Sequence, residues 1–338
     1  MTSRLGQAML AALASLVIAD PAPAPPRRLA ETGLDAPGVG VFSPQYPLWT
    51  DGASKRRWMY LPPGATIDGT RLVEWSFPVG TKFWKEFSFG GRKVETRLLW
   101  KATESQWIAV SYAWNADGTD AVLAPAEGVV GAADLGNGKQ HAIPSRMDCL
   151  ACHGATDSRP LGFTALQLSD DRDPNAIHGE PRPEGALSLE SLVASGLLTL
   201  ARSGQALRRP RIASADPETR AVLGYLSGNC GSCHSRDGDV PAVTPFLPIE
   251  PLLSDADAVA RRLTERTTTW QVPGREVGTR LVDLHGPDES ALVARMRSRR
   301  PSSQMPPLGT AVRDEEAVEK VRKWIGSWSG REITGTPQ

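Results

Sequence analysis

Apolar and polar residues alternate along the first third of the chain. Several runs between residues 41 and 135 place an apolar side chain at every second position, which is the period of a strand with one buried face. The clearest of these runs are 73–79, 94–100 and 108–114. Gly90-Gly91 lies between two of them and favours a turn. The pattern predicts an antiparallel β-rich, sandwich-like domain over residues 41–140.

After Ser145 the apolar period becomes helical. Ser188 is suited to cap a helix whose apolar stripe continues to Leu200. A second helix is predicted to begin at Asp216-Pro217 and to run directly into Cys230, and a third to open at Asp314 with an apolar stripe that includes Trp324. We therefore predict an α+β multidomain protein in which a mainly helical region follows the β-rich domain.

The N-terminus has the pattern of an export signal. A short cationic start is followed by an apolar run and by small residues at 17–19, so residues 1–19 are predicted to be a signal peptide. Residues 20–40 contain a Pro-Ala repeat and are predicted to be a flexible leader. No later segment approaches the roughly 20 apolar residues of a membrane span, so the mature chain is expected to have no transmembrane segment and to be periplasmic.

The charge balance makes several partner classes poor candidates. The 338-residue chain contains 38 Lys and Arg residues and 38 Asp and Glu residues, so its formal net charge is zero. A balanced chain without a basic stripe gives no electrostatic reason to bind nucleic acid. Lys55-Arg56-Arg57 is the tightest basic cluster, and it is expected to be a solvated loop face rather than a docking patch.

All four cysteines belong to two copies of Cys-x-x-Cys-His. These are Cys149, Cys152 and His153, and Cys230, Cys233 and His234. The pentapeptide is the attachment signature of c-type haem, in which two thiols bond to the porphyrin and the adjacent imidazole ligates the iron. Two disulfides or a four-thiolate zinc site are alternatives, but neither explains the histidine after each second cysteine. A thioredoxin-like motif would need a single copy. The sequence therefore predicts two covalently attached haem c groups.

The sixth ligand of the second haem can be approached by elimination among the methionines. Met305 is the preferred candidate, because Pro306 and Pro307 stiffen the loop that must hold its thioether against the iron. Met296 is expected in a helix core. His285 is the remaining alternative, and a bis-histidine haem would have a lower potential than one with His and Met ligands.

The first haem has no comparable candidate. His178 lies in a polar loop after the first motif, and histidine is a regular axial ligand. His141 and Met59 are further possibilities, and the sixth position could also be open. An open position would matter because a five-coordinate haem can bind peroxide or oxygen.

Three segments carry a family resemblance. They are Phe-Ser-Pro-Gln-Tyr-Pro-Leu-Trp-Thr-Asp-Gly-Ala at 42–53, Tyr-Leu-Ser-Gly-Asn-Cys at 225–230 and Gln-Met-Pro-Pro-Leu-Gly at 304–309. Over nearly all of the mature chain, the sequence resembles a family of bacterial exported dihaem c-type cytochromes with a β-rich N-terminal region. The resemblance implies periplasmic electron transfer with a redox partner protein, with the four cysteines as thioether attachments and His153 and His234 as proximal ligands.

Two classes of function stay open at this point. The preferred one is a single-electron carrier, with a first haem-binding segment at 141–212 and a second cytochrome c-like domain at 213–330. The alternative is an oxidoreductase resembling the dihaem peroxidases, with one open-coordinate catalytic haem. The two motifs start only 81 residues apart (149 to 230) and follow a large β-rich domain, which argues against the peroxidase arrangement. A β-rich binding module that serves a separate subunit is a third, weaker possibility.

Overall fold

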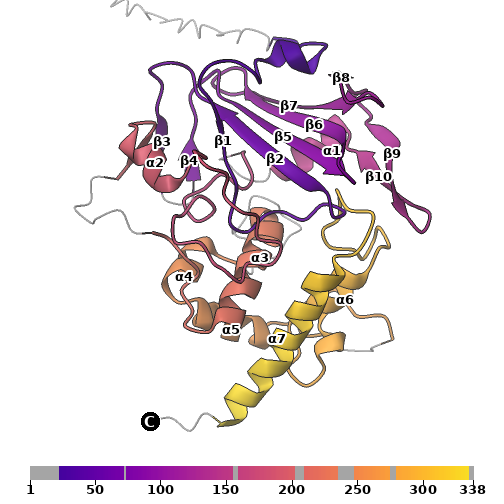
Figure 1. Ribbon diagram of the computed structural model, residues 1–338. Coiled ribbons are helices and arrows are strands. Elements are labelled where there is room, and N and C mark those ends of the chain that lie inside the picture. Colours follow the sequence, from indigo (N-terminus) through magenta and orange to yellow (C-terminus); the bar gives the residue numbers. More distant parts are fainter. Residues whose placement is uncertain are drawn as a thin grey trace, which may run out of the picture.

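The computed structural model describes residues 23–71, 74–154, 159–201, 209–234, 247–274 and 279–334. The predicted signal peptide at 1–19 lies outside these residues. Strands fill the part of the chain before residue 144, and helices dominate the part after it, so the α+β class is confirmed. In Figure 1 the sheet forms the upper half of the molecule and helices α3 to α7 form the lower half.

The main sheet is antiparallel, with the strand order β1-β2-β5-β6-β7-β8. A hairpin of β9 and β10 and a small sheet of β11, β3 and β4 accompany it. The strands are β1 Val39–Val41, β2 Ser54–Tyr60, β3 Ile67–Arg71, β4 Glu74–Ser76, β5 Lys82–Phe89, β6 Arg92–Lys101, β7 Trp107–Trp114, β8 Ala121–Leu123, β9 Val129–Gly136, β10 Lys139–Ile143 and β11 Leu198–Leu200. The predictions for 94–100 and 108–114 are confirmed, whereas the described part of the third run, 74–79, contains only the short strand β4.

Alternate residues of the main sheet enter two different cores. Phe83 of β5 and Met59 of β2 share one core with Ile67 and Trp75 from the small sheet. Trp84, the next residue along β5, enters a core on the opposite face. The strand-rich half is thus layered, with one face of the main sheet turned toward the small sheet and the other turned away from it.

The described part of the predicted leader is packed against the main sheet. Leu29, in the 3₁₀ turn η1 (Leu29–Thr32), belongs to the core on the outer face. The Trp84 indole donates a hydrogen bond of 2.9 Å to the Thr32 hydroxyl, and the Tyr112 hydroxyl donates one of 2.9 Å to the Pro26 carbonyl. The expectation of a flexible leader is therefore wrong from residue 26 onward, because these apolar and hydroxyl groups find partners on the sheet.

The helices follow the predicted pattern with one exception. Their bounds are α1 Arg146–His153, α2 Leu189–Ala194, α3 Pro217–His234, α4 Ile249–Ser254, α5 Ala256–Glu265, η2 Pro287–Glu289, α6 Ala291–Arg297 and α7 Glu315–Thr334. The starts of α3 and α7 are confirmed. Helix α2 is shorter than predicted because Gly196 adopts φ +72°, after which the chain turns into β11. Within the described residues, no helix is long and apolar enough to span a membrane.

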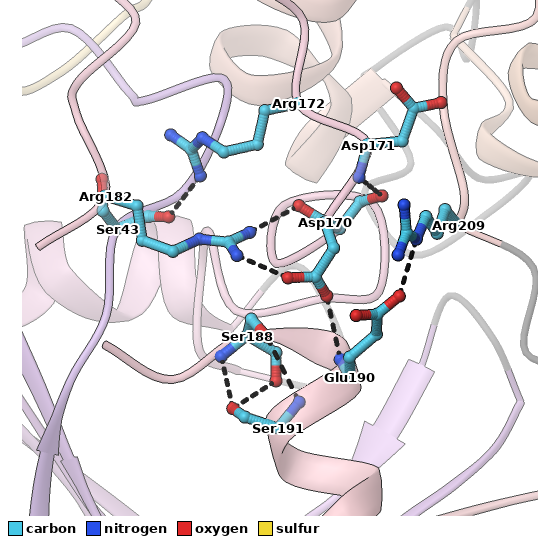
Figure 2. A network of polar contacts seen from close by, with 10 residues as sticks. Ser43, Asp170, Asp171, Arg172, Arg182, Ser188, Glu190, Ser191 and Arg209 are labelled. Carbon is cyan, nitrogen blue, oxygen red and sulfur yellow. Dashed lines mark hydrogen bonds and ion pairs between the residues drawn. The ribbon is translucent and has the colours of Figure 1, made fainter. Parts of the chain in front are cut away.

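A polar network holds the loop-rich segment between α1 and α2 in place (Figure 2). Asp170 accepts a hydrogen bond from the Arg182 guanidinium and one of 3.0 Å from the Glu190 backbone N–H at the start of α2. Arg172 donates to the Ser43 carbonyl at 2.9 Å. These bonds attach the segment after the first motif to the β-rich half, although it has little regular secondary structure.

The chain before β2 crosses helix α3 at very short range. The ring of Tyr46 lies where a Cβ on Gly224 would be, and the Tyr46 carbonyl lies where a Cβ on Gly228 would be. The Gln167 side chain accepts from the Tyr46 N–H at 2.9 Å and donates to its carbonyl at 3.0 Å. Two glycines one turn apart thus let the β-rich half approach the helix that carries the second motif.

Replacing Gly224 with alanine would place a methyl group inside the Tyr46 ring. We expect Gly224→Ala to lower the free energy of unfolding by about 1–3 kcal/mol through overpacking. Gly231→Ala is the matched control, because its Cβ would meet the nearest atom of Ile249 at an ordinary 3.7 Å. Urea denaturation followed by circular dichroism measures both variants. A Gly224→Ala protein as stable as the Gly231→Ala protein would contradict the close crossing.

Candidate functional site

The two Cys-x-x-Cys-His motifs open onto one cavity. Its volume is about 800 Å³, and it lies between the main sheet and the helical half. The six motif residues all line it, namely Cys149, Cys152, His153, Cys230, Cys233 and His234. The volume lies near the upper end of the range for pockets that enclose organic ligands, about 300–1,000 Å³. The fold therefore brings together all the cysteines and motif histidines that the sequence singled out.

The first motif occupies a capped helix. Ser145 caps α1, since its hydroxyl accepts the Asp148 N–H at 3.1 Å and the Asp148 carboxylate accepts the Ser145 N–H at 3.0 Å. At the other end, His153 Nδ1 lies 2.7 Å from the Arg159 carbonyl oxygen. A carbonyl can only accept, so Nδ1 carries the proton and the lone pair is on Nε2. Burial lowers the pKa of His153 to about 4, which keeps the ring neutral.

The second motif occupies the last turn of α3. Asp216 caps the start of this helix by accepting the Thr219 N–H at 2.9 Å. At its end, the His234 carbonyl accepts the Leu247 N–H at 3.0 Å. In a helix, residues at positions i, i+3 and i+4 share one face. Cys230, Cys233 and His234 have this spacing and line the cavity together.

The surroundings of the cysteines favour uncharged sulfur. Burial raises the pKa of Cys149 and of Cys152, and it raises the pKa of Cys230 to about 12. None of the four cysteines is paired in a disulfide. A zinc site would need thiolates, and no group of three or more His, Cys, Asp or Glu residues in the described ranges could hold a metal ion. The site therefore suits a neutral thioether better than a thiolate.

Met305 also lines the cavity. Its loop is held by backbone bonds, since the Met305 N–H donates to the Arg295 carbonyl at 3.0 Å and the Gln304 side chain donates to the carbonyls of Pro306 and Pro307. Met296 belongs to the helical core, as expected, but it lines the cavity as well. The structure thus places two thioethers on the cavity wall.

The candidates for the sixth ligand of the first haem lie elsewhere. His178 points to the start of α7, where its Nε2 lies 2.8 Å from Asp314 Oδ1. Met59 is buried in the core of the β-rich half. Neither residue lines the cavity. The structure therefore does not place His178 or Met59 on the wall of the cavity onto which the first motif opens.

His141 is committed to a buried charge network. Its Nδ1 lies 3.0 Å from Asp51 Oδ2, its Nε2 lies 3.0 Å from Glu95 Oε1, and its side chain is only 1% exposed. Carboxylates can only accept, so both ring nitrogens donate and the ring is an imidazolium. Burial lowers the pKa of His141, but the two carboxylates outweigh it and the pKa is raised. His141 therefore has no nitrogen available for iron.

The same network links distant parts of the chain. Asp51 Oδ1 accepts the N–H groups of Ala311 and Val312, at 2.7 and 3.0 Å, in the loop that leads to α7. At the other end, Glu95 pairs with Arg97, whose side chain lines the cavity. Burial raises the pKa of Glu95, but Arg97 and His141 lower it overall. The Asp51 in the Pro-Leu-Trp-Thr-Asp-Gly run thus has a structural role that the sequence did not reveal.

A row of cations crosses the cavity face of the main sheet. Arg57 of β2 is the register partner of Lys85 of β5, which is in turn the partner of Arg97 of β6. All three residues line the cavity. The expectation of a solvated loop at 55–57 is wrong for Arg57, which lies in a strand, is 4% exposed and pairs with Glu180. Alternation along β2 and β5 places Arg57 and Lys85 on the same sheet face as Met59 and Phe83, which could have indicated that they are not in solvent. Charged residues on a strand, however, usually indicate its solvent face.

The cavity wall also contains buried polar atoms with unused hydrogen-bonding capacity. The Thr50 and Thr310 hydroxyls and the Arg299 Nε and Nη1 atoms are buried, and the described residues provide no hydrogen-bond partner for them. These three residues line the cavity. Buried polar atoms of this kind call for an explanation such as a ligand. Thiols, imidazoles, apolar walls and cations are the groups that would attach, ligate and surround a porphyrin that bears carboxylates, so the residues present fit haem c.

Comparison with known proteins adds no identification. No protein-family model, curated protein or solved structure matches this chain. The family resemblance carried by residues 42–53, 225–230 and 304–309 therefore stays a prediction.

Replacing His141, the central cation of the buried network, should destabilise the folded protein. We expect His141→Gln to lower the free energy of unfolding by about 3–5 kcal/mol at about pH 6, because it leaves two buried carboxylates without their shared cation. His285→Gln is the control, since His285 is exposed. Urea denaturation of both variants gives the comparison.

The pH dependence of this effect has a defined sign. The pKa of His141 is raised, so its contribution is complete below the ordinary value of 6.5 and is lost as the pH rises through the raised pKa. The stability difference between wild type and His141→Gln should therefore narrow on the alkaline side. A difference that stays constant from about pH 6 to about pH 9 would show that His141 is not charged in the folded protein.

Proposed function

We propose that this protein is a periplasmic dihaem c-type cytochrome that transfers single electrons. One haem is attached at Cys149 and Cys152 with His153 as its proximal ligand, and the other at Cys230 and Cys233 with His234. The observation that carries the proposal is the convergence of both motifs on one cavity, together with the hydrogen bond that leaves the His153 Nε2 lone pair on the ring. A metal-ligating histidine usually donates its other N–H to a carbonyl or carboxylate in this way.

The bonds formed and broken on attachment balance within the thiol and the vinyl group. Each motif thiol would add across one vinyl group of the porphyrin, so that its S–H bond would break, an S–C bond would form and the hydrogen would go to the neighbouring vinyl carbon. The iron of such a haem would supply a one-electron couple. The chain provides the rest: the motif imidazoles fix the iron, Met305 offers a thioether as a sixth ligand, and apolar side chains of the helical core exclude water from the cavity wall.

The shared cavity supports electron exchange within the molecule. Cys152 and Cys233 are close enough for the charge of one to raise the pKa of the other. Groups attached at these two cysteines would be neighbours, and an electron received at one would pass to the other. The electron comes from and goes to redox partner proteins outside the chain, and the predicted signal peptide supports a periplasmic location for them.

A second candidate function is favoured by one observation. None of the ligands considered for the first haem, His178, His141 or Met59, lines the cavity. The haem at His153 would then have an open sixth position unless Met296 fills it. An open position supports a dihaem oxidoreductase that binds peroxide or another small ligand.

The stoichiometry of attachment is the most direct test of the proposal. Intact-mass measurement of protein from a host with haem-attachment machinery should show two added haems, and the Cys149→Ser/Cys152→Ser double variant should show one. The Cys230→Ser/Cys233→Ser variant is its mirror control, and it should also retain one haem. A wild-type mass without any added haem would overturn the proposed function.

The role of Met305 can be read from optical spectra. Met305→Leu should convert one low-spin haem to a high-spin or water-ligated state, because leucine keeps the volume and removes the sulfur. Met296→Leu is the matched control, because that side chain also lines the cavity. If the wild type already contains a high-spin haem that binds cyanide and turns over peroxide, the second candidate function is favoured. A spectral change in Met296→Leu alone would move the ligand assignment to Met296.

A further inference from the structure

Lys85 occupies the middle of the cationic row on the main sheet. Its register partners on both sides are arginines, Arg57 on β2 and Arg97 on β6. Like charges directly opposite each other on a sheet are destabilising. Three cations in one row therefore need a compensating anion close by.

The two outer members of the row have such an anion. Arg57 forms an ion pair with Glu180, with N–O distances of 2.5 and 3.1 Å, and Arg97 forms one with Glu95, at 2.5 and 3.0 Å. Lys85 differs from both. In the described part of the chain no carboxylate lies within ion-pair distance of its ammonium, which lies over the Phe87 ring, 5.0 Å from the ring centroid. Among the described residues, the ammonium in the middle of the row is thus left without an ion pair of its own, and the nearest carboxylate that acts on it, Glu180, is paired with Arg57.

The surroundings of Lys85 make this charge expensive. Burial lowers its pKa well below 10.5, and the charges of Arg57, Lys55 and Arg97 lower it further, while the Glu180 carboxylate that pairs with Arg57 offsets only part of this lowering. The side chain is nevertheless half-buried rather than fully enclosed, and it lines the cavity. An anion in the cavity would pair with the Lys85 ammonium and stabilise its charge, because buried charges are stable in proteins when they are paired.

The first motif lies next to this row. Burial is the largest cause that lowers the pKa of His153, and the charges of Lys85 and Arg97, together with that of Arg159, lower it further; Lys85 and Arg97 also lower the pKa of Cys152. A porphyrin attached here would bring two propionate carboxylates into the cavity. We propose that Lys85 binds a propionate of the haem attached at Cys149 and Cys152, flanked by Arg57 and Arg97. This inference rests on the proposed function.

The midpoint potential of the haem-loaded, full-length protein tests the inference. Intact mass first establishes that both haems are attached to each variant. In a redox titration at about pH 8, where carboxyl groups are ionised, Lys85→Gln should lower the potential of one couple, because losing a nearby positive charge favours ferric haem. We expect the ratio of reduced to oxidised haem at fixed potential to fall about tenfold, equivalent to about 59 mV for a one-electron couple.

Lys82→Gln is the matched control. Lys82 lies on the same strand but on the other face of the sheet, where its ammonium donates to the Thr32 carbonyl at 2.7 Å and lies over the Trp100 ring. The Lys82→Gln substitution should leave the midpoint potentials of both haems unchanged. If both haems are attached and Lys85→Gln behaves like Lys82→Gln, the inference is overturned while the proposed function stands. A wild type that acquires no haem overturns the proposed function itself.

Stability provides a second measurement. If Lys85 holds a buried carboxylate, Lys85→Met should lower the free energy of unfolding of the haem-loaded protein, since it leaves that carboxylate unpaired. If Lys85 has no anionic partner, the same substitution removes an isolated buried charge and should raise the free energy of unfolding. An increase in stability would therefore refute the inference. Lys85→Arg, which keeps the charge, should stay close to wild type in potential.

A free carboxylate could occupy the same place as a propionate. Adding sodium acetate to the wild-type protein distinguishes the two sources. With a propionate bound covalently through its haem, the potential of the affected couple should not change with acetate concentration. A potential that follows the acetate concentration in wild type but not in Lys85→Gln would identify a site for free anions and overturn the inference.

Discussion

The buried carboxylate of Asp51 is the point on which the two halves of the molecule depend. One of its oxygens accepts two backbone N–H groups of the loop before α7, and the other accepts from His141 on β10. His141 in turn donates to Glu95, which orients Arg97 toward the cavity. Charges of alternating sign thus extend from the C-terminal loop through the β-rich half to the first motif. Their mutual pairing is what makes so many buried ionisable groups tolerable.

The parts of the fold that local pattern determines were predictable. The helix that leads into Cys230 and the strands at 94–100 and 108–114 follow from caps and from apolar period, which act over a few residues. The convergence of the motif residues on one cavity agrees with the spacing of the signature, although no sequence rule gives the distance between the two copies. Helix α2 was overestimated because its stripe continues past Gly196, where the pairing of β11 with β3 takes over from helical preference.

The rest depends on contacts that no local pattern records. Arg57 was expected on a solvated loop face because it belongs to a cluster of basic residues, and only the tertiary structure shows that it lies in a strand against the cavity. His141 was a candidate iron ligand in the sequence because its two carboxylate partners, Asp51 and Glu95, lie 90 and 46 residues away and only the tertiary structure brings them to the ring. The packed leader was missed for a related reason, since the Trp84 and Tyr112 partners of residues 26–32 lie far along the chain.

The bond between Asp51 and the backbone at 311 and 312 joins groups 260 and 261 residues apart. Such a contact forms only after nearly the whole polypeptide has emerged, and closing so long a loop is entropically slow. Until it forms, the segment that follows the Met305 loop lacks this attachment to the β-rich half, and the Met305 loop is part of the cavity wall. Closure of that part of the wall is thereby tied to a contact between residues far apart in the sequence.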